Sequence, residues 1–161
     1  MPMTARTDSQ LLDDLDSPDE QVRAAAAVAL AERGHPNALE ASLRTLDDAP
    51  EIAHADTTPA IWSLAGMGLP ALRSLLVAMN AEQPMTRLHA GRAAMEITRR
   101  RYGHDGRDWP DGAYARWADF WRAIDYRYDA SPDQRAASVD RLRSACEAWV
   151  AADSPGRQSE R

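Results

Sequence analysis

The sequence predicts an all-α protein, an α-solenoid of about four helical hairpins stacked side by side, with about eight helices. Three observations predict this fold class. Proline and capping residues recur where apolar-patterned segments begin. Within those segments apolar residues are spaced by three and four positions, and no segment shows the period of two that is typical of a strand. The 161 residues are enough for one domain with one core.

The first four helices are predicted from start and stop signals. Ser17, with Glu20 three positions later, is a capping-box pattern that marks the start of the second helix. Gly34 and Gly66 fall where the second and fourth helices should stop. Pro59 follows the cap candidate Thr58, so the fourth helix can be broken at Thr57 to Pro59. The four predicted ranges are 8–15, 18–33, 36–48 and 51–66.

The last four helices follow the same punctuation. Pro70 and Pro84 stand at the start of apolar patterns, and Gly103 stands where the sixth helix should end. Ser131 with Gln134 forms a second capping-box pattern, which marks the start of the eighth helix. The four predicted ranges are 70–80, 84–102, 112–127 and 132–152.

Apolar residues and glycines recur at a period close to that of a helical hairpin. Two sets of apolar residues are spaced by 31 and 32 residues and by 32 and 35, and two glycines by 32. This recurrence pairs the first helix with the second, the third with the fourth and the fifth with the sixth. The recurring residues are Leu12, Leu43 and Leu75; Leu30, Trp62 and Ile97; and Gly34 with Gly66.

The segment from Asp16 to Leu30, followed by Gly34, resembles the HEAT-like helical repeat family in its short bacterial form. The third hairpin retains part of the pattern at Arg87, whereas the second, in the range 51–66, lacks the Val-Arg step. The resemblance covers about residues 9–102. It implies a HEAT-like α-solenoid in which the second helix of each hairpin lines an inner, concave side.

Aromatic residues concentrate after these repeats, in a segment at 109–152 that we interpret as a helical cap. A solenoid needs its last apolar face covered, and aromatic side chains bury a large area. Trp109 precedes the cap helices and is the better candidate for an exposed aromatic contact. We expect one domain at 8–152, a flexible amino terminus at 1–7 and a disordered tail at 153–161. The predicted aromatic stripe is Tyr114, Trp117, Trp121, Ile124 and Tyr128.

Charge and composition disfavour several classes of partner. The 19 basic residues are all Arg, and 25 acidic residues leave a net charge of −6, which opposes general attraction to nucleic acid or anionic membranes. The stretch Met1–Gln10 is too polar for a secretory signal, and no run of about 18 apolar residues occurs. We therefore expect a soluble, cytoplasmic protein. A monomer is expected, and the acidic first third and basic middle permit weak head-to-tail self-association.

The candidate binding residues are arginines and carboxylates that the resemblance places on or near the inner side. A planar guanidinium grips a carboxylate in two places. We therefore predict a non-catalytic protein–protein or peptide interaction module, or scaffold, that binds an acidic segment. A structural role for Arg23, tying Asp19 or Asp56 across adjacent repeats, is the alternative at that position. The resemblance implies this binding role for Arg23, Asp56, Arg92, Glu96 and Arg99, and the set is completed by Arg87, which lies nearby, and by Trp109, the aromatic candidate.

Two other functions stay open. The HEAT-like alkylpurine DNA glycosylases bind duplex DNA on their concave face, which implies a DNA-binding alternative, although the net charge opposes it. Glu51 and His54, at positions i and i+3 of a predicted helix, give a metal-dependent enzyme as the second alternative, but di-iron bundles need this motif twice. No nucleophile, phosphate loop or cofactor motif stands out. We therefore expect no catalytic residue, no resident metal and no cofactor.

Overall fold

The computed structural model describes residues 6–54 and 56–154. Within these ranges the chain forms eight helices and no strand, which confirms the predicted all-α class. The predictions for residues 1–5 and 155–161 lie outside the described residues. The helices are α1 (Asp8–Asp14), α2 (Glu20–Glu32), α3 (Ala38–Arg44), α4 (Pro59–Met67), α5 (Leu69–Ala78), α6 (Pro84–Arg101), α7 (Ala113–Ile124) and α8 (Pro132–Asp153).

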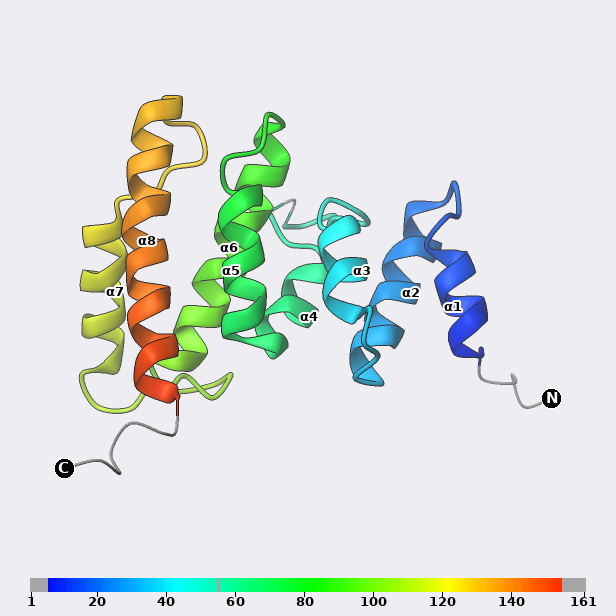
Figure 1. Cartoon of the computed structure of the whole chain (residues 1–161), viewed down its shortest axis with the longest axis horizontal. Helices are drawn as coiled ribbons and strands as arrows, with labels where there is room; N and C mark the ends of the chain where they lie inside the picture. The colour runs from blue at the N-terminus through cyan, green and yellow to red at the C-terminus, as the bar shows by residue number, and fades with distance from the viewer. Residues whose placement is uncertain (1–5, 55, 155–161) are drawn as a thin grey trace.

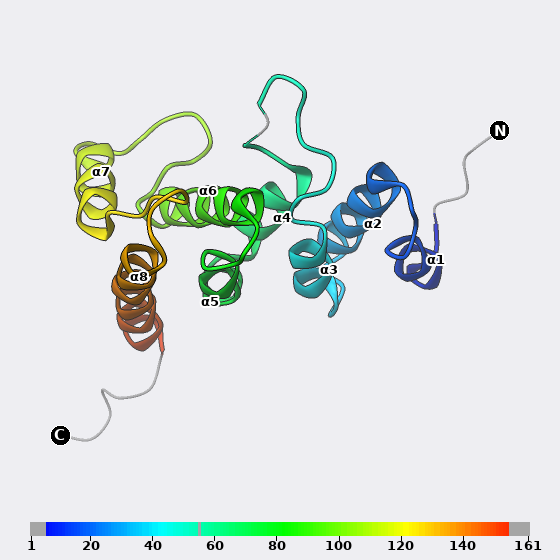
Figure 2. The same ribbon diagram turned by 90° about the horizontal axis from the view of Figure 1, so that it is seen from above.

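The first six helices lie in two rows along the longest axis of the molecule (Figures 1 and 2). We call α2, α4 and α6 the even row and α1, α3 and α5 the odd row. Each even-row helix packs against the odd-row helix that precedes it in the chain. Within the even row, α2 contacts α4 and α4 contacts α6, so the three pairs are stacked in chain order.

The last helical pair occupies the two rows in the opposite order, with its first helix in the even row and its second in the odd row. Helix α7 follows the even row beside α6, whereas α8 packs against α5 (Figure 2). The indole N–H groups of Trp117 and Trp121 both donate to the Thr98 hydroxyl of α6, at 3.1 and 2.8 Å. The chain therefore stays in the even row after α6 and crosses to the odd row only between α7 and α8.

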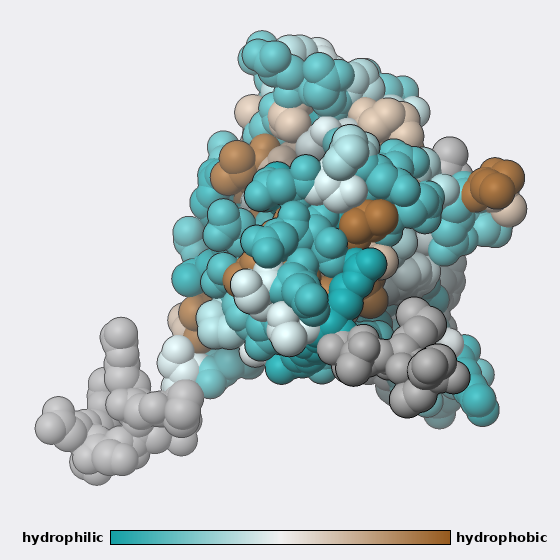
Figure 3. Space-filling view, turned by 90° about the vertical axis from the view of Figure 1, so that its right-hand side faces the viewer, coloured by the Kyte–Doolittle hydropathy of each residue, from teal (hydrophilic) through white to brown (hydrophobic). Residues whose placement is uncertain are grey.

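Alanine allows the even-row helices to approach closely. Small side chains let neighbouring backbones come together without voids, and five fully or nearly fully buried alanines lie on α4 and α6. Around them, two apolar clusters form, one over α1 to α3 and a larger one reaching α8, and Met67 packs against both. The α1 end of the molecule shows mostly hydrophilic residues to solvent (Figure 3). The five alanines are Ala60, Ala65, Ala90, Ala93 and Ala94.

The fourth helix begins at Pro59, so the prediction of a helix across 51–58 is wrong. The described residues of the segment 47–58 form a loop, in which the Glu51 N–H donates to the Thr57 carbonyl at 3.0 Å and the Thr57 N–H donates to the His54 carbonyl at 2.9 Å. Pro59 occupies the first helical position, where no N–H is needed. The turn residues therefore start the helix instead of interrupting it.

The register of the second hairpin differs from the one that the sequence repeat indicates. Leu64 lies four residues before Gly68, as Leu30 lies four residues before Gly34. Both leucines are fully buried, and both glycines have a positive φ, +69° and +62°. Trp62 is 43% exposed, so its assignment as the equivalent of Leu30 is wrong.

One of the two predicted capping boxes forms. At α8 the Ser131 hydroxyl accepts the Gln134 N–H, and the Gln134 side chain accepts the Ser131 N–H, as predicted. At α2 the cap is Asp19, whose carboxylate accepts the Gln21 N–H at 2.8 Å, while the Ser17 hydroxyl accepts the Asp19 N–H. The α2 helix therefore begins two residues later than predicted. No helix in the described ranges is long and apolar enough to cross a lipid bilayer.

Candidate functional site

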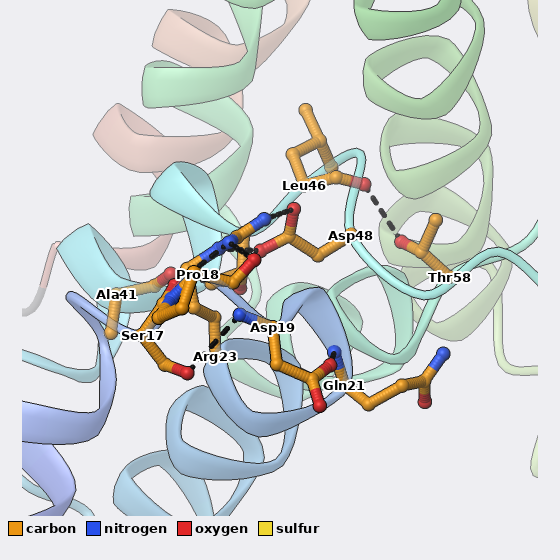
Figure 4. Close-up of polar contacts among 10 residues, drawn as sticks. Ser17, Pro18, Asp19, Gln21, Arg23, Ala41, Leu46, Asp48 and Thr58 are labelled. Atoms are coloured by element: carbon orange, nitrogen blue, oxygen red, sulfur yellow. Dashed lines mark hydrogen bonds and ion pairs between the residues drawn. The ribbon is translucent and has the colours of Figure 1, made fainter.

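Arg23 joins the turn of the first helical pair to the turn of the second (Figure 4). Its Nη1 donates to the carbonyls of Ser17 and Pro18, at 2.9 and 3.2 Å. Its Nε and Nη2 grip the Asp48 carboxylate at 2.8 and 2.7 Å. The tie across adjacent pairs thus exists, but its partner is Asp48 and not Asp19 or Asp56.

Arg87 makes the equivalent set of contacts in the third pair. Its Nη1 donates to the carbonyls of Ala81 and Glu82, at 2.9 and 2.7 Å. These residues lie six and five positions before Arg87, which is the same spacing as that of Ser17 and Pro18 from Arg23. Its Nε donates to the Tyr128 carbonyl in the next turn, at 2.8 Å. Since Arg87 is only 8% exposed, its guanidinium is committed to the backbone and is not available on the surface.

The remaining charged candidates form a network on one face of α6. Glu96 is 5% exposed, and its carboxylate lies 3.0 Å from Arg99 Nη1 and 3.7 Å from Arg92 Nη2. Arg99 Nη2 lies 3.2 Å from Nε2 of His104, in the loop after α6. The two guanidinium groups compensate the negative charge of the buried Glu96 carboxylate. The ion pairs with Glu96 in turn orient the side chains of Arg92 and Arg99.

Trp109 closes this network from the other side. The Arg99 guanidinium lies 5.6 Å from the centre of the Trp109 ring, within the range of a cation–π interaction. The same ring contacts His104, Tyr114 and Trp117, with centroids 4.9 to 5.5 Å apart. Trp109 is half-buried among these rings, and Tyr114, at 58% exposed, is the more open aromatic side chain.

Trp62, which is not among the predicted site residues, lies beside this network. Trp62 of α4 lines a groove of about 490 Å³ between α2 and α4 and also a hollow of about 560 Å³ between α4 and α6. Glu96, Arg99 and Arg100 of α6 line the same hollow. Leu64 lies four residues before Gly68, but Trp62 likewise lies four residues before Gly66, so the sequence alone does not show which of the two residues faces the core.

Asp56 and Arg92 meet at a separate hollow farther along α6. This hollow has a volume of about 330 Å³ and lies between α6 and the turn before α8, with Asp56 contributed by the 47–58 loop. Arg92 also borders the Glu96 carboxylate, as described above. The structure thus brings Asp56, Arg92, Glu96, Arg99 and Trp109 to one side of α6, and it places Arg23 and Arg87 in the turns between pairs.

The described residues offer little to support metal or covalent chemistry. No three or more His, Cys, Asp or Glu side chains gather as a metal-binding group in the ranges that the structure covers. Glu51 and His54 are exposed in the 47–58 loop, so the helical i and i+3 geometry on which the metal site was based is absent. Cys146 is buried, and burial raises the pKa of its thiol, which opposes formation of a reactive thiolate.

The base of the 47–58 loop is attached to α6 through Asp47. The Asp47 carboxylate accepts a hydrogen bond from Thr86 and lies 2.7 Å from Nδ1 of His89, which is buried. Burial raises the pKa of Asp47, but the hydrogen bonds with His89 and Thr86 outweigh burial and hold that pKa below its ordinary value. This contact fixes the loop that carries Asp56 beside α6.

We expect Asp47→Asn to reduce the free energy of unfolding by about 1 kcal/mol at pH 6, a value that allows for screening of a half-exposed carboxylate. A carboxyl whose pKa is lower in the folded state stabilises the fold above its ordinary pKa, and this contribution is lost as the pH falls through the folded-state pKa. The difference between wild type and variant should therefore shrink between pH 5 and pH 3. Urea unfolding across this range measures it, and a difference that stays constant contradicts the assignment.

Comparison with known proteins adds no relative. No family model matches the sequence, and no curated protein and no solved structure matches the chain.

Proposed function

We propose that the surface of α2, α4 and α6 around Trp62, which we call the even-row face, is a non-catalytic docking surface for a carboxylate-bearing segment of a protein or peptide. The observation that carries this proposal is Trp62, a large aromatic side chain that is 43% exposed between two hollows and beside the arginines of α6. Trp and Arg are the residues that contribute most to binding at protein interfaces. A segment bound in these hollows would cover the exposed part of the indole, which would add apolar burial to the binding energy.

We further propose that the stacked pairs are a HEAT-like α-solenoid and that this face is its inner surface. The pairing of consecutive helices and their order along the molecule support this reading. The equivalent contacts of Arg23 and Arg87 with their turns support it as well, because they repeat in two pairs with the same spacing. The exchanged last pair departs from a regular repeat.

The mixture of charges on the face favours a protein or peptide over nucleic acid. Glu32 and Asp105 line the same hollows as Trp62, and Glu96 lies between the arginines of α6. Phosphate neutralisation dominates affinity for nucleic acid, and carboxylates at the contact surface oppose it. A peptide that carries both apolar and charged side chains suits such a surface better than a uniformly charged nucleic-acid strand.

Selection of a random dodecapeptide display library on the immobilised full-length chain tests this function. We expect peptides that bind wild type and lose at least about tenfold in affinity, or 1.4 kcal/mol, with the Trp62→Ala, Arg100→Glu double variant. A matched control carries Val77→Ala and Arg143→Glu, which lie on α5 and α8, away from the even row. Circular dichroism verifies that both variants fold. Failure to enrich any peptide, or equal affinity for wild type and the face variant, would overturn the proposal.

A further inference from the structure

Three hollows meet around Trp62, Gly66 and Arg100. Trp62 belongs to the groove between α2 and α4 and to the hollow between α4 and α6. Arg100 belongs to that second hollow and to a third at the carboxyl ends of α4 and α6, and Gly66 joins the third to the groove. The groove between α2 and α4 and the hollow that contains Arg100 are therefore neighbouring subsites, separated only by the Trp62 side chain.

The groove between α2 and α4 is the apolar subsite. Its walls are aliphatic or aromatic over most of their surface, and its volume of about 490 Å³ exceeds that of one large side chain. Gly66 contributes to the wall of the groove, and a Cβ at that position would lie 3.7 Å from Arg100 Nη1. The Arg100 guanidinium therefore lies directly beside the wall of the groove. The apolar lining residues are Val28, Ala31, Pro59, Trp62 and Met67.

Arg100 is the cation of the second subsite. It is exposed and forms no ion pair with any residue in the described part of the chain, whereas neighbouring Arg99 is already held by Glu96 and His104. The nearby carboxylate of Asp105 accepts the backbone N–H groups of Arg107 and Asp108, at 2.8 and 2.9 Å, so it is committed to its own loop. An incoming carboxylate is the charge complement of Arg100.

We infer that the ligand is an extended peptide segment with a bulky apolar side chain two positions away from an Asp or Glu, the apolar side chain in the α2–α4 groove and the carboxylate on Arg100. In an extended chain, side chains i and i+2 point the same way and lie about 7 Å apart. One such pair would therefore reach two neighbouring subsites that share the Trp62 indole. This inference rests on the proposed docking function and specifies the chemistry of its ligand.

Sequencing the peptides selected on single variants tests this inference separately. On wild type we expect an acidic residue at a fixed spacing of two from Leu, Ile, Met or an aromatic residue. On Arg100→Glu the acidic preference should disappear or change to Lys and Arg, while the apolar preference remains. On Trp62→Ala the apolar preference should disappear, while the acidic preference remains.

Peptides selected on wild type but with no acidic preference, or with the same acidic preference on Arg100→Glu, would overturn the inference and leave the docking function standing. The same holds if acidic and apolar residues are enriched without a fixed spacing. If wild type enriches no peptide above a surface without protein, the docking function itself fails. The Val77→Ala, Arg143→Glu control should reproduce the wild-type preferences, and each variant is verified by circular dichroism before selection.

Discussion

Replacement of Arg87 by Met should lower the free energy of unfolding by about 3 kcal/mol. Met keeps much of the volume of the side chain but removes all three hydrogen bonds to the carbonyls of Ala81, Glu82 and Tyr128. Hydrogen bonds from a charged donor contribute about 1.5–3 kcal/mol each. The expected loss is smaller than their sum, because water can hydrogen-bond to the freed carbonyls at the two turns. Urea unfolding followed by circular dichroism should show a midpoint lower by about 1.5 M.

Arg100→Met is the matched control for this prediction, because Arg100 lies on the same helix and is exposed. It should change the free energy of unfolding by less than about 0.5 kcal/mol. If Arg87→Met and Arg100→Met have equal midpoints, Arg87 does not join the turns of the third and fourth pairs. The contrast separates a structural arginine from one that the docking proposal uses.

Thr98→Val should lower the free energy of unfolding by about 2–3 kcal/mol, although Val has nearly the shape of Thr. The Thr98 hydroxyl accepts from two indole N–H groups and donates to the Met95 carbonyl at 2.9 Å, and Thr98 itself is fully buried. Removing it leaves Trp117 and Trp121 without their acceptor at the contact between α6 and α7. Urea unfolding measures the loss, and tryptophan fluorescence reports the changed environment of the indoles.

Thr98→Ser keeps the hydroxyl and loses only a methyl group, so it should cost about 1 kcal/mol from packing. A Val variant as stable as wild type, or a Ser variant less stable than Val, contradicts the role of the hydroxyl. The pair of variants therefore separates the hydrogen bonds from the volume of the side chain.

The helix starts that the sequence predicts well depend on local chemistry. Ser131 and Gln134 satisfy each other's backbone N–H groups within one turn, so the start of α8 follows from four consecutive residues. Pro84 likewise starts α6 where predicted. At Ser17 the prediction was wrong because Asp19 offers a competing carboxylate two residues later, and the sequence alone does not rank two cap candidates this close together.

The candidate site was predicted in part. The charges on α6, at Arg92, Glu96 and Arg99, lie on one helix at positions three and four apart, so their proximity follows from helical geometry. Trp62 was missed because the spacing of 32 from Leu30 fits the repeat as well as the spacing of 34 to Leu64 does. Only the packing of α4 against α2 and α6 shows which of these residues faces the core.

The sequence by itself determined the helical class, the eight helices and most of their limits, because proline, capping residues and apolar spacing act within one or two turns. The tertiary structure alone decided the exchange of α7 and α8, the exposure of Trp62 and the commitment of Arg87 to the backbone. These depend on contacts between residues far apart in the chain, such as Arg87 with Tyr128, 41 positions later. A guanidinium has the same formula on a surface as in a turn, and only its neighbours determine which role it has.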